Sequence, residues 1–460
     1  MNHGDPDSSR GTGLRAWRQD ALLQRVLRNS GYLFGSNVIG AVLSIVTANL
    51  LGVAGLGVLG VVTSLVSNIN RLLSFRMGEV VVKHMGEYLA RGDRQRAAAI
   101  VKIAFLTEGL TSLAAYAVLA LLAPLAARFI AKDPGTTALF LVYGLSILGN
   151  FGQEVATGVL QVGGHFRSQA AINLGQSVLL AVLLVAAALT GAGLWAVTLI
   201  YLLGKLILGL GPLAVALYRL PGMLGAGWWR APLALIPDRR ALAGFAINTN
   251  FSGTINVLAR DSEQLWISFF FSPVEAGYFK VALSLINLIV MPVTPFISTT
   301  FPEITRAVAL REWPRLRSLL RRVTLLAAAW TAAVGVGLLA VGRPVLFSDW
   351  TFFGRSFHIY RPEFLPAFPA LMILLLGYGV ANVLFWNRTL LLALGQAAYP
   401  FQIGLASSLV KVALTVLLVP TYGYLMEAAL LSLYFVASVG LTTWRGLSLV
   451  RAHESAPEAA

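Results

Sequence analysis

Charged side chains within apolar stretches are the residues of this sequence that could do chemistry. Arg71 and Arg76 lie at the end of one such stretch, and Arg260 and Lys280 lie within two later ones. A charge in hydrocarbon costs about 2.5–3.5 kcal/mol even on a mild insertion scale, so it is usually retained where it meets water, a partner or a ligand. Because arginine matches phosphate oxygens with paired hydrogen bonds, Arg71 and Arg76 indicate capture of a phosphate group.

The same cations also have purely structural explanations. Arg260 and Glu263 stand three residues apart on one helix face and could pair, with Lys280 joining them across a short turn. Arg71 and Arg76 could serve only to orient the chain in a membrane. The residue pattern leaves both explanations open.

Acidic side chains form a second set within the apolar stretches. They could couple a process to protons or cations, or they could simply form charge pairs; the set comprises Glu108, Glu154, Asp261 and Glu263. Lys205 and Lys411 are the cations with which these carboxylates could pair, and Glu427 is another carboxylate that could pair with them. We expect Glu108, Glu154 and Glu427 to be partners of these lysines, and we leave the role of Glu263 open.

Polar and small residues recur at helical spacing in the same stretches. Steps of three or four residues place each series on one helix face. The amides that we expect to line a central polar cavity are Asn37, Asn68, Asn256 and Asn287. The alternative is ordinary helix packing, in which small residues allow close approach and hydroxyls and amides bond across the interface.

The elements that must position these residues are membrane-spanning helices. The chain is 57% hydrophobic and 12% charged, with a mean hydropathy of +0.74, whereas a soluble domain is about 25% charged. This composition excludes an ordinary soluble protein and a disordered one. Since one span takes about 20 apolar residues, we predict about twelve transmembrane helices, at 29–51, 54–75, 97–122, 137–161, 169–190, 193–218, 242–270, 276–299, 321–342, 365–390, 398–419 and 422–446.

The predicted spans form two sets of six. We expect an all-α membrane protein of two six-helix bundles related by a pseudo-twofold axis along the membrane normal, because an even number of spans returns the chain to the same side. The expected parts are a tail (1–28), a bundle (29–218), a surface linker (219–241), a second bundle (242–446) and a tail (447–460). Most of the 35 lysines and arginines fall on the side that holds both termini, which predicts that both termini are cytoplasmic.

Several function classes are disfavoured by residue usage. The chain has no cysteine, and its five histidines have no paired metal-ligand spacing, so we expect no metal site, no cofactor and no catalytic residues. The net charge of +15 fits the orientation rule for membrane proteins and needs no nucleic-acid partner.

Three segments carry a resemblance to a known family. They are Ser74–Lys83 followed by the Gly92-Asp93 turn, Arg260–Ala276 followed by Gly277-Tyr278, and Asn387–Gly395. In these, and over most of residues 29–446, the sequence resembles the Wzx-type oligosaccharide flippases of the multidrug/oligosaccharidyl-lipid/polysaccharide exporter superfamily. The resemblance implies a V-shaped pair of bundles that works by alternating access.

The resemblance also implies a substrate and a cellular setting. The substrate would be an oligosaccharide linked to undecaprenyl diphosphate, moved from the inner to the outer leaflet of the bacterial inner membrane for O-antigen, capsule or exopolysaccharide assembly. Polysaccharide polymerase and chain-length regulator proteins would be partners. Arg71 or Arg76 would meet the entering diphosphate, the four asparagines would contact sugars, and Arg260 and Lys280 would hold the anion nearer the outer end.

Two other functions compete with this one. A cation-coupled drug or metabolite antiporter of the same superfamily would depend on Glu108, Glu154 or Asp261. A membrane-embedded glycosyltransferase or polymerase would need a sizeable external loop, and the longest external segment expected here, 343–364, is too short for a domain.

Overall fold

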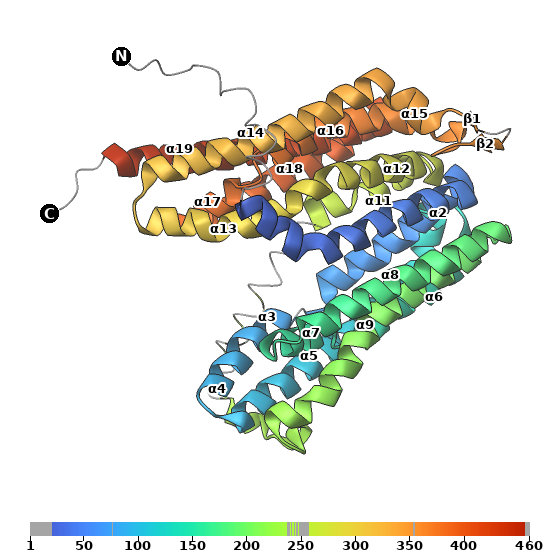
Figure 1. The fold of residues 1–460 in the computed structure, drawn as a ribbon. Coiled ribbons are helices and arrows are strands. Elements are labelled where there is room, and N and C mark those ends of the chain that lie inside the picture. The colour runs from blue at the N-terminus through green and yellow to red at the C-terminus, as the bar shows by residue number, and fades with distance from the viewer. Residues whose placement is uncertain are drawn as a thin grey trace, which may run out of the picture.

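The computed structural model describes residues 21–75, 77–236, 257–352 and 355–455, with single positions at 240, 242, 244 and 247. Apart from one short antiparallel hairpin, β1 (Trp350–Phe352) and β2 (Arg355–Phe357), the regular elements in these ranges are helical. Figure 1 shows the long helices gathered into two lobes that lie close together near α2 and α12 and spread apart toward α4 and α13. The all-α, two-lobe architecture predicted from the sequence is therefore confirmed.

The first lobe is built from long helices joined by glycine-containing turns. Its elements are α2 (Ala21–Leu73), α3 (Gly78–Val80), η1 (Val81–Met85), α4 (Gly86–Ala90), α5 (Arg94–Phe129), η2 (Pro134–Thr136), α6 (Thr137–Gly149), α7 (Gln153–Val162), α8 (Phe166–Leu189) and α9 (Leu194–Leu224), followed by the short turns η3 (Trp228–Arg230) and η4 (Leu233–Leu235).

The second lobe repeats this construction with the hairpin added. Its elements are η5 (Val257–Asp261), α11 (Glu263–Phe270), α12 (Pro273–Val290), η6 (Met291–Val293), α13 (Thr294–Ala309), α14 (Trp313–Gly337), η7 (Leu338–Gly342), α15 (Arg343–Phe347), η8 (Pro362–Phe364), α16 (Ala367–Val383), α17 (Asn387–Ala393), α18 (Ala398–Tyr422) and α19 (Tyr424–Ser455).

Ten helical segments in the described ranges are long and apolar enough to cross a membrane. The first two predicted spans share α2, in which Gly52 breaks the helix with a φ of 67°. That left-handed conformation favours glycine because it lacks a Cβ atom. Much of the predicted seventh span, 242–270, lies outside the described residues. These two facts account for the difference between twelve predicted spans and ten segments.

Local signals in the sequence explain where individual helices begin. The predicted Gly92-Asp93 stop and cap is present: Gly92 has a φ of 77°, and the Asp93 side chain accepts a hydrogen bond from the backbone N–H of Arg96 at the start of α5. Between α6 and α7, Gly152 adopts a φ of 74°. This break leaves the first residues of α7 facing the space between the lobes.

The lobes meet most closely where α2 crosses α12. A Cβ atom on Gly57 of α2 would overlap the carbonyl oxygen of Pro273, and one on Gly277 of α12 would overlap that of Val53. Glycine at both positions therefore allows the two backbones to touch, as small residues do at membrane helix crossings.

Polar contacts close one end of this interface. The Asn49 amide donates to the Ile359 carbonyl at 2.7 Å and accepts from the Arg361 backbone N–H at 3.1 Å. Nearby, the Lys132 ammonium donates to the Phe269 carbonyl at 2.8 Å. By sequence-based topology all of these residues belong to the external side, so the structure is closed at that end and spreads open toward the other.

Candidate functional site

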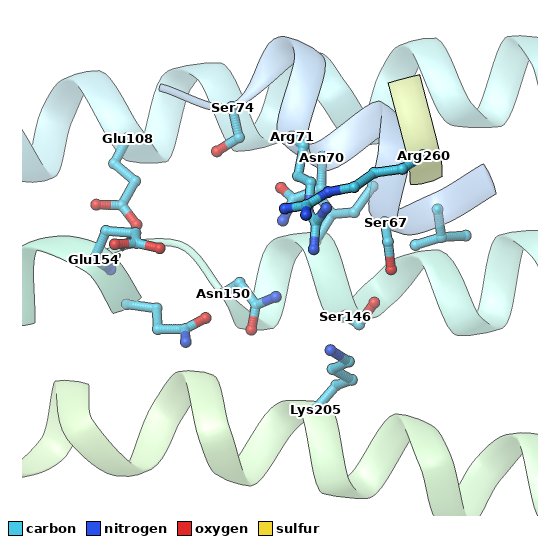
Figure 2. A pocket seen from close by; sticks show the side chains of 13 residues that line it. Ser67, Asn70, Arg71, Ser74, Glu108, Ser146, Asn150, Glu154, Lys205 and Arg260 are labelled. Atoms are coloured by element: carbon cyan, nitrogen blue, oxygen red, sulfur yellow. Dashed lines mark hydrogen bonds between the residues drawn. The ribbon is translucent and has the colours of Figure 1, made fainter. Parts of the chain in front are cut away.

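Two adjoining cavities lie where the lobes separate. The larger has a volume of about 450 Å³ and is lined by α2, α5, α6, α7, α9 and η5; the smaller has a volume of about 330 Å³. Ser67, Arg71, Lys205 and Arg260 line both. The cavities therefore form one continuous polar space between the lobes, part of which is drawn in Figure 2.

Three cations from three separate elements face this space. Arg71 is in the last turn of α2, Lys205 is on α9, and Arg260 is in the π-helical turn η5. Figure 2 shows Lys205 pointing from α9 into the cavity, whose opposite wall carries the two arginines. Lys205 and Arg260 make no hydrogen bond or ion pair with the part of the chain that the structure describes. We call Arg71, Lys205 and Arg260 the cation trio.

The third member of the trio, Arg71, forms an ion pair across the lobes. Its guanidinium contacts the Asp261 carboxylate of the second lobe. Beside this pair, the Asn68 amide donates to the Asp261 backbone carbonyl at 2.9 Å. Both side chains of the pair are partly exposed, with 50% of Arg71 and 28% of Asp261 accessible, so an incoming anion could compete with Asp261 for Arg71.

The remaining wall of the larger cavity presents amides and hydroxyls. Asn70, Asn150, Gln153 and Ser146 line it, and the side-chain carbonyl oxygens of Asn70 and Asn150 are buried without a hydrogen-bond partner in the described chain. A buried acceptor of this kind normally finds a donor. The amide and hydroxyl side chains of this wall make it polar.

Glu108 is used to hold a helix end. Its carboxylate accepts hydrogen bonds from the backbone N–H groups of Glu154 at 3.0 Å and Val155 at 3.1 Å. These are unsatisfied donors of the first turn of α7, where a negative charge is also favoured by the helix dipole. The structure thus gives Glu108 a capping role that the sequence did not suggest. Glu154 lines the cavity beside it.

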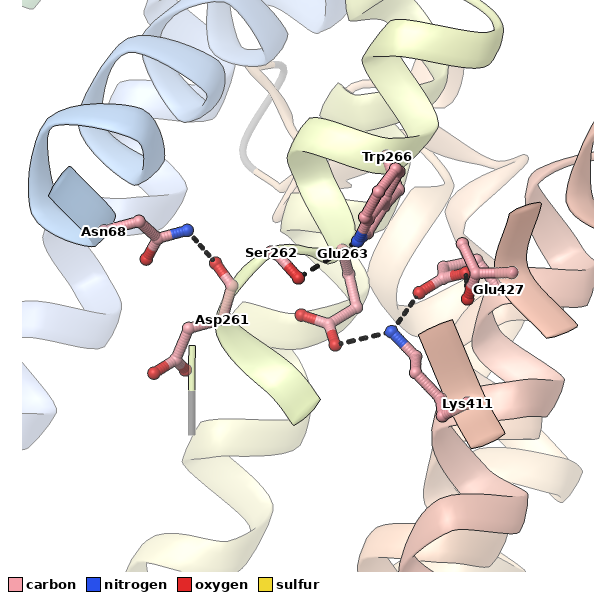
Figure 3. A network of polar contacts seen from close by, with 8 residues as sticks. Asn68, Asp261, Ser262, Glu263, Trp266, Lys411 and Glu427 are labelled. Carbon is pink, nitrogen blue, oxygen red and sulfur yellow. Dashed lines mark hydrogen bonds and ion pairs between the residues drawn. The ribbon is translucent and has the colours of Figure 1, made fainter. Parts of the chain in front are cut away.

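Glu263 points away from the trio into the second lobe. The predicted pair with Arg260 is not formed: Lys411 of α18 lies 3.1 Å from Glu263 and also contacts Glu427 of α19, as Figure 3 shows. The reason is local, because η5 ends at Asp261 and α11 begins at Glu263, so the two residues do not share one regular helix face. The expected pairing of Lys411 with a glutamate is confirmed.

The other predicted site residues lie apart from the trio or cannot be placed. Lys280 packs beside Gly60 of α2 and makes no hydrogen bond or ion pair to the described chain, so it does not join Arg260 and Glu263. Asn287 lines a separate cavity of about 400 Å³ between α2 and α12. Arg76 and Asn256 lie outside the described residues, and of Asn37 only the backbone, within α2, is described.

Arg71 and Arg260 were expected at different depths in the membrane, where they would bind the anion one after the other. They instead line the same two cavities. Spacing in sequence could not reveal this, because the depth of Arg260 depends on where the turn η5 meets α2. Lys205, Asn70 and Asn150 were missed as site residues; the signal available was that each is a polar residue within an apolar stretch.

Comparisons with known proteins agree with this architecture. Residues 46–357 match the family model described as "Polysaccharide biosynthesis protein". The sequence has no significant match among curated proteins. Among solved structures, an inward-facing multidrug resistance MATE family transporter of the MOP superfamily is similar with a TM-score of 0.68 and 13% identity, over 92% of this chain and 96% of that one.

Two further structures have the same overall arrangement. The lipid II flippase MurJ in an inward closed conformation has a TM-score of 0.68 and 13% identity, over 92% of this chain and 91% of that one. A MOP superfamily transporter from Pyrococcus furiosus has a TM-score of 0.60 and 12% identity, over 95% and 96% of the two chains. At such low identity these similarities establish the fold.

Proposed function

Because the chain belongs to the polysaccharide biosynthesis protein family, we propose that it is a flippase for a lipid-linked oligosaccharide. The substrate is an oligosaccharide joined to undecaprenyl diphosphate, and the protein moves it from the inner to the outer leaflet by alternating access. The observation that carries this proposal is the cation trio, which lines a cavity between two lobes.

The charge of the trio suits a diphosphate bridge. Arg71, Lys205 and Arg260 supply three positive charges, and Asp261 removes one of them. Two further carboxylates, Glu108 and Glu154, line the larger cavity, where Glu108 is bound to the backbone N–H groups at the start of α7. Arginine guanidinium groups and lysine ammonium groups are the usual protein groups that bind phosphate oxygens. The diphosphate is therefore bound here, while its prenyl chain stays in the lipid.

The sugars occupy the amide-lined wall of the larger cavity. Asn70, Asn150 and Gln153 offer amide donors and acceptors, and the buried carbonyl oxygens of the two asparagines lack donors in the described chain. Of the asparagines expected at the sugars, Asn68 lines the smaller cavity and donates to the Asp261 carbonyl, and Asn287 lines a separate cavity.

The membrane setting follows from the charge distribution along the chain. If most lysines and arginines are cytoplasmic, the termini face the cytoplasm and the spread end of the lobes faces inward. The resemblance to oligosaccharide flippases implies that the membrane is the bacterial inner membrane. The conformation drawn in Figure 1 is then the state that receives substrate from the inner leaflet. The product supplies O-antigen, capsule or exopolysaccharide assembly, where a polymerase and a chain-length regulator are the expected partners.

A drug antiporter is the alternative that the fold leaves open, since a MATE family transporter has a similar structure. The two unpaired cations of the trio, Lys205 and Arg260, favour an anionic substrate over a cationic drug near them.

Deletion of the gene tests the proposal in cells. We expect complete undecaprenyl-linked oligosaccharide to accumulate on the inner leaflet while surface polysaccharide is lost, and the wild-type gene to restore both. Unchanged lipid intermediates together with raised drug sensitivity would contradict the flippase and identify the antiporter.

A further inference from the structure

A buried ion cluster lies in the second lobe, beside the smaller cavity. It consists of Glu263, Lys411 and Glu427, whose side chains are 1%, 2% and 0% exposed. The Lys411 ammonium lies between the two carboxylates, and Thr415 donates to the second oxygen of Glu427 at 2.8 Å. Figure 3 shows the lysine bridging α11 and α19 from α18. We call these three residues the buried triad.

The charges of the buried triad do not balance. Two carboxylates share one ammonium, which leaves one surplus negative charge inside the lobe. An uncompensated charge in such surroundings costs several kcal/mol, and the usual relief is a neutralising proton or ion. The described groups nearest to the triad do not supply that charge.

Those surrounding groups come from every element packed on the triad. Tyr378 of α16 and Tyr434 of α19 lie near Glu263. Arg260 and Asp261 of η5 act on Tyr378 with opposite signs, and Asp261 is paired with Arg71. On α18, the neighbouring polar groups are the hydroxyls of Ser408 and Thr415. Arg71, Lys205 and Arg260 line the smaller cavity with Glu263, and Lys280 of α12 lies with Gln264 beside Gly60. In the described ranges none of these four cations forms an ion pair with a carboxylate of the triad.

We propose that the buried triad is a proton-binding site and that Glu263 is the group that takes up the proton. Glu427 has both carboxylate oxygens engaged, by Lys411 and Thr415, and so remains the constant counter-ion of the lysine. Glu263 gives one oxygen to Lys411 at 3.1 Å and also lines the smaller cavity between the lobes. That cavity is the route by which the proton arrives and leaves.

The chemistry of the site favours a proton over a metal ion. The Lys411 ammonium already occupies the position between the carboxylates where a cation would bind. One proton on Glu263 leaves the neutral acid beside an intact Lys411–Glu427 pair, so the cluster becomes neutral without moving any side chain far.

The position of Glu263 links proton binding to the lobes. Glu263 is the first residue of α11, immediately after the segment in which Asp261 holds Arg71 and Asn68 of the first lobe. A change in the ion pair between Glu263 and Lys411 therefore acts directly on the contact that Asp261 makes with the first lobe. This inference goes beyond the proposed substrate, and its test needs no substrate.

Infrared difference spectroscopy of the purified full chain in lipid nanodiscs tests the proposal. As the pH falls, we expect the wild-type protein to gain the carbonyl band of one protonated carboxylic acid. Both Glu263→Gln and Glu427→Gln should lose that band, because each leaves a balanced pair with Lys411. The control Glu303→Gln, which removes a surface carboxylate paired with Arg315, should keep it.

Two further measurements keep the proposal testable if a glutamine variant folds poorly. Lys411→Met leaves two carboxylates without a cation and should raise the band to twice its wild-type amplitude. Replacing K⁺ by Na⁺ should leave the wild-type band unchanged. A wild-type spectrum without the band, retention of it in either glutamine variant, or its suppression by Na⁺ would overturn the proposal.

Discussion

Lys205 is the residue that the structure adds to the site. The sequence shows it as a charge within an apolar stretch, and pairing with a glutamate was the expected explanation. In the folded chain it has no such partner in the described ranges and faces Arg71 and Arg260 across the cavity. Its role could not be read from spacing, because no short-range pattern states that α9 lies opposite η5.

Loss of either unpaired cation should weaken binding of a prenyl diphosphate. A hydrogen bond to a charged group contributes about 1.5–3 kcal/mol, so we expect Lys205→Met and Arg260→Ala each to raise the Kd for undecaprenyl diphosphate by roughly 10–100-fold. Calorimetry on the purified protein measures this. Lys205→Arg should retain most of the affinity, and Arg321→Ala, on the exposed face of α14, should retain all of it. Unchanged affinity in both loss variants would contradict the role of the trio.

At the scale of elements, sequence periodicity located the helices but not their breaks. The turn expected at Gly92-Asp93 is present, and Gly52 also has a positive φ, which glycine adopts readily. The division of the predicted span 137–161 into α6 and α7 was not predicted, although Asn150 and Gly152 are residues that favour a turn. That break matters for the site, since it exposes the N–H groups at the start of α7 that Glu108 binds.

The cap on α7 should be measurable as stability. We expect Glu108→Ala to lower the free energy of unfolding by about 1–3 kcal/mol, because buried N–H groups lose a charged acceptor. Thermal unfolding in detergent checks this. Glu303→Gln, a surface change, should leave the melting temperature within error; an equal loss of stability in both variants would contradict the specific cap.

Across the whole molecule, the two lobes were predicted from the even number of spans, but the conformation was not. Sequence cannot state which end is closed, because both states use the same helices. The closed end depends on particular contacts, such as the Asn49 amide with the 359–361 backbone and the crossing at Gly57.

Glycine at the crossing should set the balance between conformations. A methyl group at Gly57 overlaps the Pro273 carbonyl, whereas Gly40 of the same helix has open space around it. The chain has no native cysteine, so spin labels at R91C and L310C can report the separation of the lobes at the spread end. We expect Gly57→Ala to enrich shorter distances and Gly40→Ala to leave the distribution unchanged. No shift in Gly57→Ala would contradict this account of the closed end.

The most direct test of the central claim is translocation by the purified protein. Proteoliposomes containing undecaprenyl-diphosphate-linked oligosaccharide are treated with an impermeant reagent that oxidises exposed sugars, and the protected fraction is followed in time. We predict that the wild-type protein exposes the inner-leaflet pool and that a Lys205→Met/Arg260→Ala variant leaves it protected. Equal protection in wild-type proteoliposomes and protein-free liposomes would contradict the account.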